Sequence, residues 1–237
     1  MASSTSKSSW RKGFRDGLPF VVMIVPFGMV FGVIGTEAGL NIAEIMGFSV
    51  LVIAGSAQLA ALQLMADNTP TLIILITSLA INLRMAMYSA SLTPHFGAAT
   101  FWQRVLAAYV LVDQSYALAM DRFDRNPEMS TSDKLSYYFG VAAPVVTLWY
   151  ASTLSGAILG EAIPADLQLD FIVPLMFLSM VAPALKTLAH VAAALTSVCL
   201  SLVFAFLPYG SGLLVAALVA LVVGSQVELW TQKRAQA

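Results

Sequence analysis

Long apolar stretches separated by short polar connections fill most of this chain. Four of these stretches contain no Asp, Glu, Lys or Arg: residues 17–36, 45–66, 135–160 and 187–227. A bilayer core about 30 Å thick needs roughly 20 apolar residues of helix to cross it. Each stretch reaches that length, so the pattern predicts helices that lie in a membrane.

The same pattern predicts an all-α fold, a polytopic transmembrane helix bundle with broken helices. We expect eight hydrophobic segments: residues 18–36, 45–65, 70–92, 102–120, 135–158, 168–185, 187–207 and 209–229. They form one transmembrane domain over residues 17–230, between a polar cytoplasmic tail, 1–16, and a second tail, 231–237. Whether segments 45–65 and 168–185 cross fully stays open.

Loop charges predict the topology, because Lys and Arg accumulate on the cytoplasmic side of a membrane. With eight crossings, three basic clusters fall on one side: Lys7 to Arg15, Arg122 to Lys134, and Lys233 with Arg234. Among Lys and Arg, the opposite side keeps only Arg104. We therefore expect a multi-pass protein of the bacterial cytoplasmic (inner) membrane with both termini cytoplasmic. Residues 1–10 lack the apolar core of a removable signal peptide.

Composition narrows the function. Charged residues make up 11% of the chain, against about 25% in soluble domains. The net charge of −1 argues against a basic surface that binds nucleic acid. Cys199 is the single cysteine, and His95 and His190 lack metal-ligand spacing, so we expect no disulfide within the chain, no metal site and no cofactor. No enzyme or nucleotide-binding motif occurs, which disfavours catalysis.

The chain also shows a weak internal duplication, which suggests repeats over residues 17–120 and 135–230. Segment 18–36 contains Pro26 and segment 135–158 contains Pro144, and each leads to a Gly-rich stretch and a Glu. Repeats are common in secondary transporters. The copies are parallel if all segments cross and inverted if one only dips into the bilayer. Chance likeness between apolar segments is the competing explanation.

Segment 18–36 is rich in Pro and Gly, notably Pro26 and Gly28. Proline removes an amide hydrogen and leaves an upstream carbonyl unpaired. In lipid, such a carbonyl must find a partner or line a wet cavity. One interpretation is a broken helix that presents its backbone to a substrate; the other is close helix packing through the glycines.

A small polar patch, Ala54-Gly55-Ser56-Ala57-Gln58, lies inside an uncharged stretch. Gly55 allows a ligand or another backbone to approach, while Ser56 and Gln58 offer donors and acceptors. These groups could hold the carboxylate and ammonium of an amino acid. The alternative is a hydrogen bond between helices, which is modest in strength in membranes.

Segment 70–92 contains Asn82 and Arg84 at membrane depth. An Arg at mid-bilayer costs about 2.5–3.5 kcal/mol on insertion scales, so it needs a partner. Asp113 lies at a similar depth if the chain turns near Gly97. Arg84 could instead bind a substrate carboxylate or extend toward the nearer surface. Asp113 is either the partner of Arg84 or a carrier of a coupling proton, since burial disfavours a charged carboxylate.

Several short motifs, in order over residues 14–190, resemble the AzlC-like family of branched-chain amino acid exporters. They are Phe14-Arg15-Asp16-Gly17-Leu18-Pro19 with Pro26-Phe27-Gly28; Ala54-Gly55-Ser56-Ala57-Gln58; Asn82-Leu83-Arg84 followed by Tyr88; and Leu169-Asp170-Phe171 with Val181-Ala182-Pro183. The resemblance adds Tyr88 and Pro183 to the candidate substrate-binding residues. Met85 stands where family members often have His, so a role of that His in proton handling is not carried over.

The resemblance implies the large subunit of a two-component permease in the lipid bilayer. Such a protein would export valine, leucine and isoleucine, sometimes methionine, with a small AzlD-like membrane subunit; a homo-oligomer is left open. A passive channel or a non-transporting scaffold would also explain polar residues at membrane depth. Saturating, partner-dependent efflux would favour the exporter over both.

Overall fold

The structure is a computed structural model that describes residues 6–160, 185–207 and 211–236. In these ranges it contains helices and short connections and no strand, which confirms the all-α fold class. The chain divides into two compact units, residues 1–62 with 81–167 and residues 63–80 with 168–237. Segment 168–185 lies outside the described residues up to residue 184. So do both of its motifs, Leu169-Asp170-Phe171 and Val181-Ala182-Pro183.

From Ser6 onward the predicted N-terminal tail is helical. α1 (Ser6–Gly17) leads through a 3-10 turn (Leu18–Phe20) into α2 (Val21–Glu37), and together they are long and apolar enough to cross a membrane. The helix break that we considered at Pro26 is absent, because α2 continues through it. The change of helix type falls at Leu18–Phe20 instead, with a proline in the first turn, where its missing amide hydrogen costs nothing.

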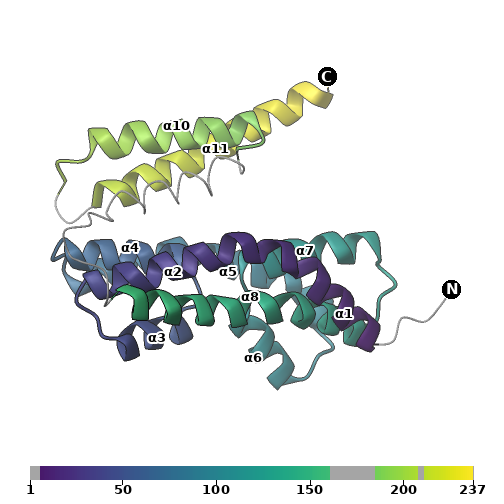
Figure 1. Cartoon of the computed structure of the whole chain (residues 1–237). Coiled ribbons are helices and arrows are strands. Elements are labelled where there is room, and N and C mark those ends of the chain that lie inside the picture. The colour runs from purple at the N-terminus through teal and green to yellow at the C-terminus, as the bar shows by residue number, and fades with distance from the viewer. Residues whose placement is uncertain (1–5, 161–184, 208–210, 237) are drawn as a thin grey trace. The chain divides into compact units, whose positions relative to one another are not determined.

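α8 (Thr131–Gly160) runs parallel to α1 and α2 and packs closely against both (Figure 1). Successive glycines of the first span meet successive residues of α8: Gly13 meets Tyr137, Gly28 meets Ser152, and Gly32 meets Ala157. A side chain at any of these glycines would collide with α8. The close-packing interpretation of Gly28 is therefore what the structure contains, as expected where small residues let backbones approach.

Segment 45–65 consists of two helices, α3 (Ile42–Leu51) and α4 (Gly55–Ala66), joined by residues 52–54. α3 runs back along α2, since Ile45 contacts Gly35 and Phe48 packs edge-on against Phe31. The chain can turn into α3 because Gly39, at φ +84°, adopts the left-handed conformation that ends α2.

Segment 102–120 also consists of two helices, α6 (Phe101–Tyr109) and α7 (Asp113–Arg125). α7 returns to the end of the bundle where α6 begins, because the Phe123 ring lies 5.9 Å from that of Phe96. The expected crossing by segment 102–120 is therefore wrong: the segment is a helical hairpin. Hydropathy records the length of an apolar stretch but not a reversal of its direction.

α5 (Thr71–Phe96) runs antiparallel to α8, with the ring of Phe96 5.3 Å from that of Tyr138 and Lys134 Nζ 3.3 Å from His95 Nδ1. Gln58 of α4 donates to Ser49 of α3, so α4 also runs back toward the end where α3 begins. Figure 1 shows α3 with α4, and α6 with α7, toward opposite ends of α8.

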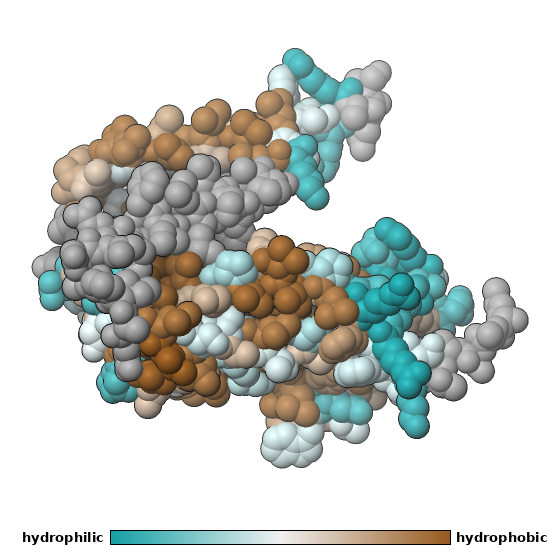
Figure 2. Space-filling view, in the orientation of Figure 1, coloured by the Kyte–Doolittle hydropathy of each residue, from teal (hydrophilic) through white to brown (hydrophobic). Residues whose placement is uncertain are grey.

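Two of the eight hydrophobic segments are thus hairpins that enter the bundle from opposite ends. Four described helical stretches are long and apolar enough to cross a membrane: residues 6–37, 71–96, 131–160 and 215–234. Removing two crossings keeps the basic clusters of α1, α7 and α8 together, and the turn before α6 brings Arg104 to the same end. Figure 2 shows the hydrophilic side chains of this unit gathered where α1 begins.

The second unit contains α10 (Leu188–Val203) and α11 (Ser211–Gln236), which form an antiparallel pair. Gly212 approaches Phe204, and Gly224 approaches Ala193. α11 continues through the predicted C-terminal tail, where the Arg234 guanidinium lies 3.7 Å from the centre of the Trp230 ring. The proposed repeat of residues 135–230 stays a prediction, since part of it lies outside the described residues.

Candidate functional site

Arg84, on α5, links the two helix breaks in the middle of the first unit. Its Nη2 donates to Ser56 Oγ at 2.7 Å, and its Nη1 lies 3.1 Å from Asp113 Oδ2. Ser56 is in the first turn of α4, and Asp113 is in the first turn of α7. One guanidinium therefore contacts the N-terminal ends of both second helices. The expected Arg84–Asp113 pair is present, and extension of Arg84 to the surface is not.

The α3–α4 connection is held by a fully buried amide. Gln58 Oε1 accepts from the Ala54 backbone N–H at 3.3 Å, and Gln58 Nε2 donates to Ser49 Oγ at 3.2 Å. These bonds join α4 to the last turns of α3 across the break. A buried polar group without partners would be costly, so the two bonds fix the connection. Gln58 thus determines where Ser56 sits.

Gly55 lets α4 begin close to the first span and α8. A side chain there would collide with the rings of Phe27 and Trp149. The Trp149 ring also stacks near Phe31, with centroids 6.1 Å apart. Gly55 therefore packs against an aromatic cluster of α2 and α8, which fixes the position of the α3–α4 connection.

The α6–α7 connection has its own cap. Val112 is extended, and its backbone N–H donates to Ser115 Oγ at 3.0 Å. Before the break, Tyr109 Oη donates to the Val50 carbonyl at 2.9 Å, and Tyr150 Oη lies 2.8 Å from Tyr109 Oη. Val50 belongs to the last turn of α3, whose carbonyls lack helical partners. The tips of the two hairpins are therefore hydrogen-bonded to each other.

The site carries excess positive charge. Each helix N-terminus acts as roughly +0.5 elementary charge, so the starts of α4 and α7 add to the full charge of Arg84, while Asp113 offsets one unit. Arg84 Nε and Asp113 Oδ1 are buried and have no hydrogen-bond partner within the described structure. The two side chains keep 28% and 39% of their surface exposed. The arrangement can accept a carboxylate beside Arg84 while leaving Asp113 for a cationic group.

Tyr88 joins this site one helical turn after Arg84. Its ring stacks on that of Tyr116 with centroids 4.0 Å apart. Its hydroxyl interacts electrostatically with both Arg84 and Asp113. Of the remaining candidates, Asn82 has a buried Oδ1 without a hydrogen bond in the described part of the chain. Pro26 lies exposed on α2, away from the break.

Four residues that the sequence analysis did not single out complete the site: Ser49, Tyr109, Tyr116 and Trp149. Their signals in the sequence were weak, because hydroxyl and aromatic residues are common in membrane helices. A helix start at Asp113 was detectable, since an acidic residue followed by Ser115 is a typical N-terminal pattern. No group of three or more His, Cys, Asp or Glu side chains that could hold a metal ion occurs in the described residues.

The fold and site define a polytopic helical membrane protein with two opposed hairpins around a partly buried arginine. The chain belongs to the AzlC family: the family model described as AzlC protein matches residues 19–163, more than half of the sequence. That range contains both hairpins, Arg84 and Asp113. The motifs on which the resemblance was based lead to the same family.

Similar proteins are also membrane proteins. The inner membrane protein YgaZ of Escherichia coli is 26% identical over 178 residues, which cover 73% of this chain and 71% of YgaZ. An uncharacterized membrane protein of Archaeoglobus fulgidus is 25% identical over 230 residues, which cover 92% of this chain and 95% of the relative. An uncharacterized membrane protein of Helicobacter pylori is 25% identical over 172 residues, 70% of this chain and 73% of the relative. No solved structure matches the chain.

Proposed function

We propose that this protein is a secondary transporter that exports branched-chain amino acids across the bacterial cytoplasmic membrane, together with a small AzlD-like membrane subunit. The observation that carries the proposal is Arg84 placed between the N-termini of α4 and α7. Half-helices whose positive ends point at the anionic group of a substrate are typical of secondary transporters. Family membership supports the same class.

The charges of the site suit an amino acid. The carboxylate would bind the Arg84 guanidinium, whose planar fork matches two carboxylate oxygens. The ammonium would bind Asp113, whose Oδ1 is buried without a hydrogen bond in the described structure, with Tyr88 beside it. Ser56 and the first amides of α4 would add donors to the carboxylate.

The basic end of the bundle supports a proposed orientation in the membrane. Since Lys and Arg gather on the cytoplasmic side, the end where α1 and α8 begin would face the cytoplasm. The α6–α7 hairpin would then enter from the cytoplasm and the α3–α4 hairpin from outside. Movement of the α6–α7 hairpin against the α3–α4 hairpin would expose Arg84 to one side and then to the other.

Asp113 is the proposed proton-coupling residue. While ionised, it holds Arg84 at 3.1 Å. A proton on Asp113 would neutralise the carboxylate that the substrate ammonium would contact, so a proton and an amino acid would compete for Asp113. Proton entry could then be exchanged for amino acid export at the same two side chains.

Efflux from proteoliposomes tests the proposal. Vesicles that contain the full chain, with and without a co-purified small subunit, are loaded with labelled valine, and release is followed with and without a pH gradient. We expect saturable release that needs the subunit, and release slowed on the order of 100-fold in vesicles that carry the Arg84→Lys variant. Arg125→Lys is the matched control, because Arg125 pairs with Asp121 on an exposed helix surface. Valine release that is equal in empty and protein-containing vesicles would refute the proposed function.

A further inference from the structure

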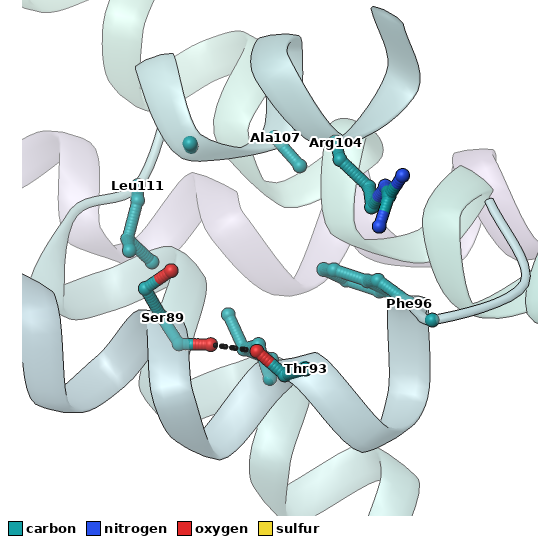
Figure 3. Close-up of a pocket in the computed structure, with 9 residues that line it drawn as sticks. Ser89, Thr93, Phe96, Arg104, Ala107 and Leu111 are labelled. Carbon is teal, nitrogen blue, oxygen red and sulfur yellow. Dashed lines mark hydrogen bonds between the residues drawn. The ribbon is translucent and has the colours of Figure 1, made fainter. Parts of the chain in front are cut away.

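A cavity of about 130 Å³ lies between the last turns of α5 and the face of α6 (Figure 3). Leu92 and Phe96 of α5, Ala107 of α6 and Leu111 in the α6–α7 connection line it. Leu111 belongs to the connection that leads to Asp113, so the cavity ends beside the Arg84 site. Its other end lies at the turn between α5 and α6, on the basic side of the bundle.

The cavity combines apolar walls with one unpaired cation. Arg104 lines it, and its guanidinium has no ion pair or hydrogen bond among the residues that the structure describes. Figure 3 shows this guanidinium on the same side as the Phe96 ring, opposite Ser89 and Thr93. The Thr93 hydroxyl already donates to the Ser89 carbonyl at 2.9 Å. Its oxygen remains available as an acceptor.

We infer that this cavity is a second binding site for a small hydrophobic amino acid, with the carboxylate on Arg104 and the side chain between α5 and α6. The inference rests on the proposed function and assigns the cavity as the cytoplasmic waiting site before Arg84. An apolar cavity of about 150 Å³ holds a benzene molecule. The four-carbon side chain of leucine therefore fits the present volume, and Arg104 supplies the charge that a plain hydrocarbon would not use.

Protection of an introduced cysteine tests the site without requiring transport. The single native cysteine, Cys199, is replaced by alanine, and Ala108→Cys is introduced at the cavity wall in the full chain in detergent. A small maleimide then labels the cavity thiol. We expect leucine to slow labelling at least about threefold, whereas glycine, which lacks the side chain, and isoamylamine, which is leucine without its carboxylate, leave the rate unchanged.

Three variants separate this site from the Arg84 site. Ala117→Cys, exposed on α7, is the matched control and should label at the same rate with and without leucine. Arg104→Gln should abolish protection at Ala108→Cys. Arg84→Lys should keep protection although efflux is lost. Protection without any efflux would support the cavity site while the proposed transport fails, and efflux without protection would overturn the cavity site alone.

The competing source of a negative group is a lipid. Labelling is therefore compared in nanodiscs of neutral phosphatidylcholine and in nanodiscs with an anionic phospholipid. Leucine protection in neutral lipid supports the amino acid site. Slow labelling that depends on anionic lipid and does not respond to leucine overturns the inference, as does equal leucine protection in the Arg104→Gln variant.

Discussion

The α3–α4 and α6–α7 hairpins resemble each other in shape but differ in what holds their tips. Both breaks contain β-branched residues, Val52 in one and Val110 and Val112 in the other. In both hairpins the first turn of the second helix contacts Arg84. The α3–α4 tip is uncharged and is fixed from within by Gln58 and by Gly55 packed on aromatic rings. The α6–α7 tip carries the charge of Asp113 and is attached to its surroundings by an ion pair and by Tyr109. This difference suggests that α3–α4 is the fixed wall of the site and α6–α7 the part whose contacts can exchange.

The largest effect is expected at Arg84, which serves both hairpins. Arg84→Lys keeps the charge but cannot contact Ser56 and Asp113 with one planar group. A charge-assisted hydrogen bond contributes about 1.5–3 kcal/mol. We expect valine efflux to fall on the order of 100-fold, which corresponds to about 2.7 kcal/mol, with little loss of folded protein. Efflux at the normal rate from normally folded Arg84→Lys protein would show that the fork geometry is unimportant.

The next effect tests whether the α3–α4 hairpin is a fixed wall. Gly55→Val would push into Phe27 and Trp149, and overpacking costs about 1–3 kcal/mol. We expect a lower melting temperature in detergent together with loss of efflux. Gly47→Val is the matched control in the same hairpin, because a side chain at Gly47 meets nothing within 4 Å. If the two variants have the same melting temperature, the packing of Gly55 does not stabilise the tip.

A double-mutant cycle tests whether the α6–α7 tip is attached through charge. Arg84→Ala leaves Asp113 without its partner, and we expect a loss of folded protein that Asp113→Ala partly restores. Contacting charges couple by about 0.5–3 kcal/mol, and the partial exposure of this pair favours the lower part of that range. Chemical denaturation of the four proteins in detergent gives the coupling. Additive effects of the two substitutions would mean that the pair contributes no stability.

The smallest effect is expected where the two tips touch. Tyr109→Phe removes the hydrogen bond to the Val50 carbonyl, and a neutral hydrogen bond contributes about 0.5–1.5 kcal/mol. We expect a small loss of stability and a change in the efflux rate, because the tips separate more easily. Tyr150→Phe, which leaves the Tyr109–Val50 bond in place, is the control. Identical efflux from the wild type and both variants would show that the hydrogen bond between the two tips has no role in transport.

Several features of the site were readable before the structure because their physics is local or depends on depth. An arginine in an apolar helix needs a partner, and Asp113 was the acid at matching depth; the two are 3.1 Å apart. The small residues of Ala54-Gly55-Ser56 indicated close approach, and Gly55 lies against Phe27 and Trp149. Gln58 was left between substrate contact and helix contact, and its visible bonds are within the hairpin.

Other features were not readable because they depend on where distant residues meet. The crossing assigned to residues 102–120 was wrong, since an apolar run has the same hydropathy whether it crosses or turns back at Val112. That error placed Arg104 at the wrong end of the bundle. The hydrogen bond from Tyr109 to the Val50 carbonyl joins positions far apart in the chain, and no pattern in either segment predicts it.

The sequence by itself determined that lipid surrounds the apolar segments and which few polar groups within them need hydrogen-bond or ionic partners. Both follow from hydropathy and charge, which are properties of each residue summed along a segment. Only the tertiary structure decided the direction of each half-helix and the convergence of two helix N-termini on Arg84. Those features arise from packing between segments, where small residues such as Gly28 and Gly55 set which backbones can approach.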